Sequence, residues 1–325
     1  MRLPKPRGPL SEWLVSRLSS PDATGTGGSA PAAGSWDDEC ISLWTLHELS
    51  FRGFEDADDR AEWHPAALEV RHALETALED RLRARWLASG VPEAGVPALA
   101  PGDVPGAVEA LVAADDGPSL ADFVRRRADR DQALELLRQR SVYHLKESDP
   151  SAFVVPRLPV RAKAALMELQ YDEYGDGDPN RLHAHLFARG LEAAGLRAEY
   201  GAYVDDAIPE NLEMNNAGSL FGLHRRLRGA AMGHLAAFEM TSSIPSRKMV
   251  QGLERIGLEG PMAAYYDEHV EADAIHEHLA LRDICGTLAE DEPEQGPDIL
   301  FGAWTCLDVE ARFATAMLAG WDDEQ

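Results

Sequence analysis

The segment Tyr266-Asp-Glu-His-Val-Glu-Ala-Asp-Ala-Ile-His276 decides how the rest of the chain is interpreted. It contains no proline or glycine and few residues that favour strands, so it is predicted to be helical. His269, Asp273 and His276 are spaced by four and three residues and fall on one narrow stripe of that helix. Two imidazoles and a carboxylate on one stripe are typical of metal ligands. The alternative is a solvated polar face, which an acidic chain also supplies.

Composition limits the partners of the chain. It has 325 residues, of which 45% are hydrophobic, so a sizeable core can form. Its formal net charge is −25. Binding to nucleic acid requires a basic surface, and an anionic membrane would repel this chain, so neither partner is expected. A cationic or amine-bearing small molecule is compatible with the acidic field.

Cysteine usage and hydropathy indicate the compartment. Cys40, Cys285 and Cys306 are far apart and form no C-x-x-C pair, which suits a reducing cytosol. No apolar run approaches the ~20 residues of a membrane span. The basic N-terminus is followed by no apolar stretch of the kind found in secretory signals. The protein is therefore expected to be cytoplasmic.

The apolar spacing is helical almost everywhere from Trp36 onward, and the only short candidate strand is 153–155. The chain is therefore predicted to be all-α. We expect a flexible N-terminal segment at 1–35, with room for a short amphipathic helix before residue 20. An N-terminal helical region at 36–145 follows, which could mediate homodimerisation or cap a pocket. Its four tryptophans suit an interface or a plain core equally, and residues 146–325 form the main domain.

Further candidate ligands lie outside the opening segment. Glu173 stands just before the turn-forming run 175–179, and His183 follows that run, so a tight turn would bring both to one point. Glu239 lies within Leu-Ala-Ala-Phe-Glu-Met-Thr, where a lone carboxylate is costly unless it is paired or metal-bound. Glu147 ends another helix and alone would be read as an exposed acid. Carboxylates and imidazoles from several helices are typical of di-iron or di-manganese sites.

Taken together, these residues resemble the ligands of the haem-oxygenase-like di-iron oxidases, a family of iron-containing redox enzymes. The local strings at 168–175, 182–187, 233–243 and 267–273 carry the resemblance, which covers roughly residues 37–320. It implies a helical bundle like that of haem oxygenase, without haem, in which 146–325 is the di-iron domain. The implied metal ligands are Glu147, Glu173, His183, Glu239, His269, Asp273 and His276.

The resemblance also implies an activity. It implies two Fe(II) ions per chain, dioxygen as co-substrate, an external electron donor and a small-molecule substrate. The ligand spacing is most similar to that of N-oxygenating members, which implies an amine, guanidine or amino-acid substrate in a biosynthetic pathway. Other relatives catalyse decarboxylation, C–C cleavage or desaturation, and these reactions stay open. So does a helical metal-binding protein without turnover.

Individual roles are expected as follows. Glu239 is expected to bridge the irons, because its surroundings are the most apolar. Glu173, His183 and His276 are expected at one iron, and Glu147, His269 and Asp273 at the other. Asp172, Tyr266 and His234 are expected to support the ligands, so that the predicted catalytic residues are Glu239, Tyr266 and Asp172. A true haem oxygenase would use His47 as its haem ligand, and a thiaminase-like relative would need a nucleophilic cysteine.

Overall fold

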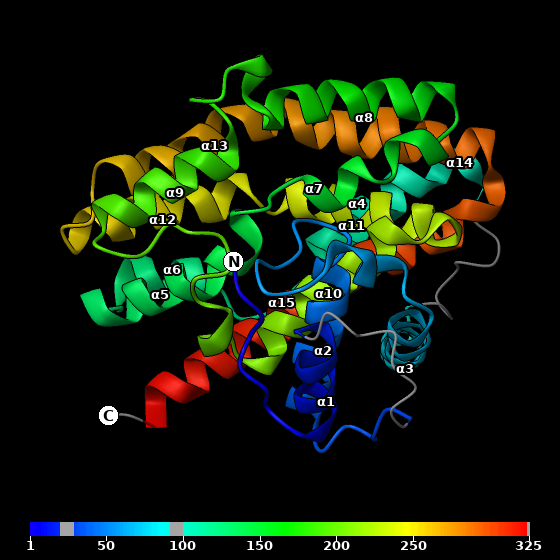
Figure 1. Ribbon diagram of the computed structural model, residues 1–325. Helices are drawn as coiled ribbons and strands as arrows, with labels where there is room; N and C mark the ends of the chain where they lie inside the picture. Colours follow the sequence, from blue (N-terminus) through cyan, green and yellow to red (C-terminus); the bar gives the residue numbers. More distant parts are fainter. Residues whose placement is uncertain (20–28, 92–99, 324–325) are drawn as a thin grey trace.

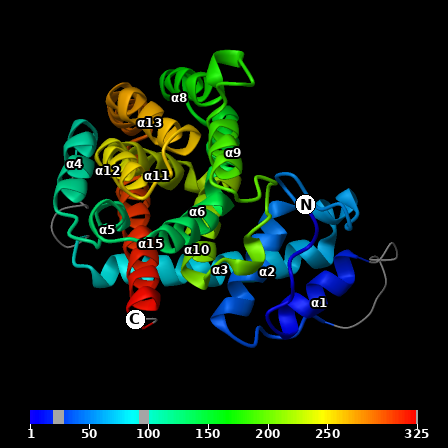
Figure 2. The ribbon, with the colours of Figure 1, turned by 90° about the vertical axis from the view of Figure 1, so that its left-hand side faces the viewer.

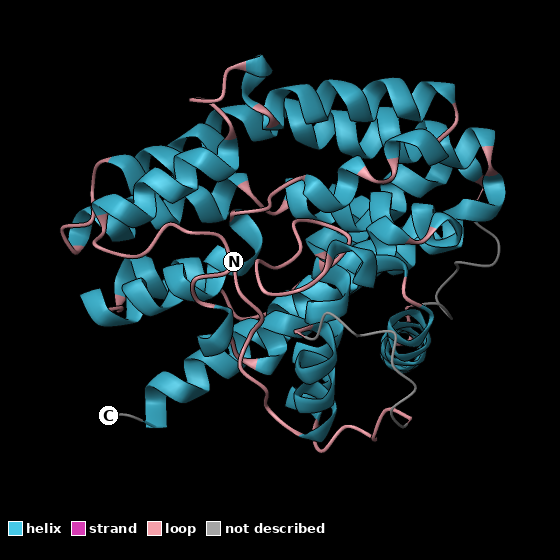
Figure 3. Cartoon of the chain, in the orientation of Figure 1, coloured by secondary structure: helices cyan, strands magenta, loops and turns pink. Residues whose placement is uncertain are grey.

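The computed structural model describes residues 1–19, 29–91 and 100–323, without the side chains of 271–275 and 323. The helices are α1 (Pro9–Leu18), α2 (Trp36–Glu48), α3 (Pro65–Ala88), α4 (Val104–Ala113), α5 (Leu120–Arg126), α6 (Arg130–His144), α7 (Asp149–Ala152), α8 (Val160–Glu173), α9 (His183–Ala193), α10 (Pro209–Leu223), α11 (Arg228–Met240), α12 (Ser243–Arg255), α13 (Pro261–His278), α14 (Thr287–Asp291) and α15 (Gly296–Asp323). The described part contains no strand (Figure 3). The all-α prediction is confirmed, and the candidate strand at 153–155 is a turn that leads into the 3-10 helix Val155–Arg157.

Sequence signals explain where several helices begin. Ser35 caps α2, because its side chain accepts a hydrogen bond from the backbone N–H of Asp38. Asp129 and Gln132 form a reciprocal capping box at the start of α6. Proline is the first residue of α3 and α10, where its missing N–H costs nothing. These local signals fix where α2, α3, α6 and α10 begin.

Helices α11 and α15 pack closely through two glycines. A Cβ added at Gly233 would lie 1.8 Å from the carbonyl oxygen of Ile299, and one added at Gly302 would lie 1.9 Å from that of Ala230. Only glycine permits backbones to approach so closely. In Figure 2, α15 runs beneath α11, and the two form the centre of the molecule.

The remaining helices that position the site lie around this pair. Helix α13 packs against α9 and α12, and it continues into a π-helical segment, Leu279–Gly286, which packs against α8. Both views place α8 and α13 side by side along one edge of the molecule (Figures 1 and 2). Helix α6 contacts α9 and α10 on the other side. The ends of α6, α8 and α9 are thereby brought next to α13.

The N-terminus differs from the prediction of a flexible segment at 1–35. Helix α1 packs on α2 with Leu10, Leu14 and Leu18 buried. The Asp38 carboxylate accepts hydrogen bonds from the backbone N–H groups of Leu10 and Ser11 at 3.0 and 2.9 Å. An amphipathic helix with a buried acceptor at its start is fixed to the body of the protein. The predicted linker after it lies largely at 20–28, outside the described residues.

The predicted division at 145/146 does not separate two hydrophobic cores. One core cluster joins Leu82 of α3 to Leu235 of α11, and another joins Leu136 of α6 to Tyr265 of α13. The amphipathic helices before residue 146 therefore bury their apolar faces against those after it. The tryptophans follow this pattern: Trp44 and Trp86 are core residues, whereas Trp63 is 74% exposed.

No helix within the described residues is both long and apolar enough to span a membrane.

Candidate metal centre

Six of the predicted ligands form two buried groups. Glu147, His183 and His269 make one group, and Glu173, Glu239 and His276 make the other. Within each group the ligand atoms lie within 4.8 Å of one another. They come from α8, α9, α11 and α13 and from the turn after α6, so segments far apart in the sequence converge here.

The carboxylate of Glu173, a member of the second group, also faces the first group. Its Oε2 is 3.1 Å from His183 Nδ1, and its Oε1 is 3.4 Å from His276 Nδ1. Glu239 faces only the second of these histidines, with its Oε2 3.5 Å from His276 Nδ1. The Ser148 hydroxyl donates to Glu173 Oε2 at 3.0 Å. One carboxylate oxygen thus points to each group, as expected of a bridging ligand.

Backbone conformation places the residues on either side of this bridge. Ser148 has φ 67°, a left-handed conformation that is uncommon for a residue other than glycine. Gly175 has φ 71°, and a Cβ there would lie 2.6 Å from the backbone of Leu182. The chain therefore folds back on itself between Glu173 and His183. Helix α9 begins at His183, because the turn takes up the residues between Glu173 and His183.

Hydrogen bonds orient two of the histidines. His269 Nδ1 donates to the backbone carbonyl of Tyr265 at 2.8 Å, which leaves Nε2 as the nitrogen that faces Glu147, 3.8 Å from its Oε1. His276 Nε2 contacts Asp172 Oδ2 at 2.6 Å, which leaves Nδ1 facing Glu173. A histidine that ligates a metal through one nitrogen ordinarily donates its other N–H to a carboxylate or carbonyl.

Glu147 is held by two side chains besides His269. The Tyr265 hydroxyl donates to Glu147 Oε2 at 2.9 Å, and His144 Nδ1 lies 3.1 Å from Oε1. Burial alone would raise the pKa of Glu147, but the charge and hydrogen bond of His144 and the charge of the nearby His269 hold the pKa well below its ordinary value. Glu147 is therefore an ionised, buried carboxylate.

The second group has an excess of negative charge. Burial raises the pKa of Glu239, Glu173 raises it further, and His276 opposes both. Burial would lower the pKa of His276, but Glu239, Glu173 and Asp172 raise it to about 9. Burial would also lower the pKa of His269, but the neighbouring Glu147 carboxylate raises it to about 10. Protons thus balance the carboxylates, and a bound cation would replace them.

Two nitrogen atoms show that these residues suit a metal ion. His183 Nδ1 and His269 Nε2 are buried and make no hydrogen bond with any described residue. Buried polar atoms without a partner are rare in folded proteins and call for an explanation. Both atoms lie next to carboxylates, in a mixture of imidazole and carboxylate that suits iron or manganese. The donor set therefore fits iron, the metal that the family resemblance implies.

The structure changes some of the predicted roles. His183 lies with Glu147 and His269, whereas the sequence analysis grouped it with Glu173 and His276. The distances favour Glu173 over Glu239 as the bridge, because burial identifies a costly carboxylate but not its position between two groups. Asp273 belongs to α13, but its side chain is outside the described residues, so its role as a ligand stays a prediction.

The supporting residues also differ in part. Asp172 contacts His276 as expected. The Tyr266 hydroxyl makes no hydrogen bond with a described residue, and the neighbouring Tyr265 contacts Glu147 instead. The sequence offered a signal for the role of Tyr265. Tyr265 stands four residues before His269, and this spacing places both residues on one face of the helix. His234 lines the adjacent cavity and belongs to neither ligand group.

The structure gives no support to haem binding by His47 or to a nucleophilic cysteine. Both ring nitrogens of His47 are engaged, one with Glu75 Oε1 at 3.1 Å and one with Asn216 Oδ1 at 3.3 Å, so none is free for haem. Cys40, Cys285 and Cys306 are buried, and burial raises the pKa of each thiol. A reactive thiol needs the opposite shift.

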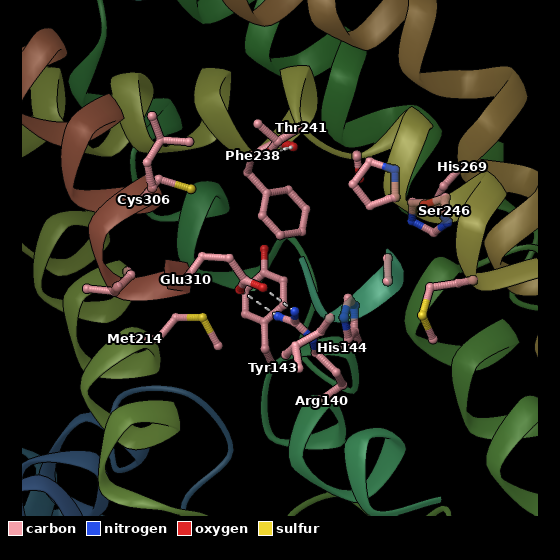
Figure 4. A pocket seen from close by; sticks show the side chains of 18 of the residues that line it. Arg140, Tyr143, His144, Met214, Phe238, Thr241, Ser246, His269, Cys306 and Glu310 are labelled. Carbon is pink, nitrogen blue, oxygen red and sulfur yellow. Dashed lines mark hydrogen bonds and ion pairs between the residues drawn. The ribbon is translucent and has the colours of Figure 1, made fainter. Parts of the chain in front are cut away.

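A cavity of ≈240 Å³ adjoins the first ligand group. Figure 4 shows His269 and Ser246 on one side of it and Met214, Cys306 and Glu310 on the other. Its walls are largely apolar and aromatic, and they include Leu136, Tyr143, Phe238, Met249, Tyr266 and Val309. Residues before 146 contribute to this wall through α5 and α6. The cavity brings a small molecule within reach of Glu147 and His269.

Fold and site together define an all-α protein with a paired histidine–carboxylate centre beside an apolar cavity. The family model of iron-containing redox enzymes matches residues 134–311, which is more than half of the chain. The chain belongs to this family and is by that membership an oxidoreductase. The match begins within α6, before the boundary predicted at 145/146, in agreement with the shared core. No curated protein matches the chain.

Proposed function

We propose that the protein is a non-haem di-iron oxidoreductase that uses dioxygen to oxidise a small molecule held in the cavity. The observation that carries the proposal is that Glu173, a member of one buried three-residue group, also has an oxygen 3.1 Å from His183 Nδ1 of the other group. A single metal site would not require a carboxylate with one oxygen directed to each side. Membership of an iron-containing redox family supports iron over manganese.

The proposed ligand assignment follows the two groups. Glu147, His183 and His269 would hold one iron, Glu239 and His276 would hold the other, and Glu173 would be shared by the two sites. Asp273 is the proposed seventh ligand, by its place on the stripe with His269 and His276. Iron, when bound, supplies the electrons for dioxygen chemistry.

The chain's own residues orient the ligands and exclude water. Tyr265 and His144 fix the carboxylate of Glu147, and Asp172 fixes the ring of His276. Ser148 fixes the carboxylate of Glu173. Orientation of this kind tunes a metal centre and its affinity. The apolar wall of the cavity keeps the substrate in a dry environment, where electrostatic interactions are stronger than in water.

For the reaction type, N-oxygenation of an amine or guanidine is the proposal that the resemblance in ligand spacing supports. The net charge of −25 favours the approach of a cationic substrate. Decarboxylation, C–C cleavage and desaturation are the competing outcomes, and an external electron donor would complete the cycle in each case.

An anaerobic Fe(II) titration followed by exposure to dioxygen tests the proposal. We expect two irons per chain, a transient visible absorption after mixing with dioxygen, and consumption of dioxygen. A screen of amines and amino acids for faster decay of that absorption would then identify the substrate class, with product analysis separating N-oxygenation from C–C cleavage. Iron bound without any dioxygen consumption would reduce the protein to a metal-binding module.

A further inference from the structure

Helix α10 contains a glycine that no contact requires. A Cβ added at Gly222 would lie 2.4 Å from the carbonyl oxygen of Pro150, so that position must be glycine. A Cβ added at Gly218 would meet no heavy atom within 4 Å. Glycine inside a helix destabilises it relative to alanine. Gly218 therefore lowers helix stability without relieving a clash.

Gly218 lines the cavity next to the first ligand group. Met214, one helical turn earlier, lines the same cavity and lies across it from His269 (Figure 4). The space that a side chain at Gly218 would take is thus cavity space. The residue type at this position sets how much of the wall is open to a ligand.

The cavity extends along α6. Leu136, Arg140, Tyr143 and His144 all line it from one face of α6, and Glu147 lines it just beyond the helix. At about 1.5 Å per residue, the stretch from Leu136 to His144 extends on the order of 12 Å. The cavity is thus a passage that runs along the helix to the first ligand group.

The lining of the passage combines polar and apolar side chains. Glu147 and His269 stand at the metal end, and Arg140, whose Nη1 is 2.8 Å from Oε2 of Glu310, lines the passage one helical turn before His144 (Figure 4). Apolar and aromatic side chains, among them Leu136 and Tyr143, make up much of the remaining wall. A matching ligand therefore has an apolar part beside a polar one.

We propose that Gly218 is a specificity-determining residue that keeps the passage open for the apolar part of the substrate. This inference rests on the proposed function, because it takes the cavity as the substrate site of the metal centre. The body of the substrate passes over Gly218, and a side chain there shortens or narrows the molecules that are accepted.

Binding of a series of straight-chain primary alcohols, from butanol to decanol, tests the proposal. Calorimetric titrations use the full chain, both metal-free and loaded with Fe(II) under anaerobic conditions. In wild type the affinity should rise about fourfold with each added methylene until the passage is filled. Gly218→Leu should reach its limit about three to four carbons earlier, because its side chain fills that space in a close-packed wall.

Two further variants make the result specific. Gly218→Ala adds one carbon and a better helix former, so it should fold and show a limit between wild type and Gly218→Leu. Gly106→Leu is the matched control, because Gly106 is inside α4, is exposed, and also has nothing within 4 Å of an added Cβ. Its chain-length limit should equal that of wild type.

Several outcomes would overturn the proposal. These are an equal limit in wild type and Gly218→Leu, an equal shift in Gly106→Leu, and no alcohol binding to wild type. Iron stoichiometry is measured in the same samples. If wild type binds no iron, the di-iron function is contradicted. If wild type binds iron but Gly218→Leu has the same chain-length limit as wild type, only the role of Gly218 is contradicted.

Discussion

His276 Nε2 and Asp172 Oδ2 are 2.6 Å apart, although the His276 ring is buried and the Asp172 side chain is 42% exposed. A partly solvated carboxylate thus orients a buried imidazole and directs its Nδ1 at Glu173 and Glu239. The contact joins α8 to α13, and both helices carry ligands. Metal affinity at the second group should therefore depend on a residue that is not itself a ligand.

We predict that Asp172→Asn weakens the second iron site by about 10- to 100-fold. The amide oxygen can still accept the N–H of His276, so the ring keeps its direction, but the neutral partner makes the imidazole a weaker base. Anaerobic Fe(II) titration measures the effect. Glu168→Gln, an exposed acid on the same helix, is the control. Equal affinities in Asp172→Asn and wild type would remove Asp172 from the site.

We predict that Tyr265→Phe destabilises the metal-free protein by about 1–3 kcal/mol, because it leaves the buried Glu147 carboxylate without one of its donors. The ring still packs against Phe187 and His269, so the cost is that of the hydroxyl. Tyr266→Phe is the matched control and should change the stability little. Chemical denaturation of both variants decides, and similar losses in the two would show that the Glu147 contact is not responsible.

The sequence predicts the membership of the site better than its arrangement. Spacing along α13 places His269 and His276 on one stripe, and the six described ligands converge as the pattern indicates. Spacing cannot tell which carboxylate lies between the metals, because this depends on how the turn after Glu173 meets Ser148. The helical periodicity predicts the all-α class, but it does not reveal which helices share a core. The packing of α1, fixed by Asp38 from a distant helix, is a tertiary contact of that kind.

We predict that the metal-free protein loses stability as pH falls from about 6.5 to 4, in part through His234. Burial lowers the pKa of His234 to about 4, from the ordinary value of 6.5 for histidine. Between these values the unfolded chain binds more protons than the folded one, so stability rises with pH in this window and is lost on acidification. At about 1.4 kcal/mol per pKa unit, His234 contributes about 3 kcal/mol.

The variant His234→Gln isolates that contribution. Its loss of stability between pH 6.5 and 4 should be smaller than that of wild type, while the exposed His278→Gln should behave like wild type. His47, whose pKa burial also lowers to about 4, is unchanged in both variants and cancels in the comparison. Denaturation curves recorded across the pH range in the presence of a chelator give the slopes. Equal slopes in all three proteins would contradict the prediction.

We predict that Gly218→Ala raises the stability of the protein by about 0.5–1 kcal/mol, because alanine restricts the unfolded chain and the added Cβ meets open space. Gly106→Ala, in the interior of α4, should gain a similar amount. Thermal unfolding measures both. Only the Gly218 variant should also show altered binding, which would separate a glycine kept for function from one that is merely tolerated. A loss of stability in Gly218→Ala would mean that the wall is already filled.

We predict that two buried carboxylates of the same group differ in their effect on iron binding. If Glu173 bridges the irons, Glu173→Gln should impair both sites, whereas Glu239→Gln should leave the site of Glu147, His183 and His269 able to bind one iron. Iron stoichiometry after anaerobic loading distinguishes them. Two irons in Glu173→Gln, or none in Glu239→Gln, would reverse the assignment.

The metal-free protein gives an independent check on Glu239. Burial raises its pKa, so the stability that its protonated form provides is present at low pH and is lost as pH rises through the folded-state pKa. Glu239→Gln removes this charge and should be no less stable than wild type near neutral pH. A structural ion pair would behave in the opposite way, but the nearby Arg228 is bound to Glu292 instead. A loss of a few kcal/mol in the metal-free variant, with iron binding intact, would show that Glu239 is a structural acid and not a ligand.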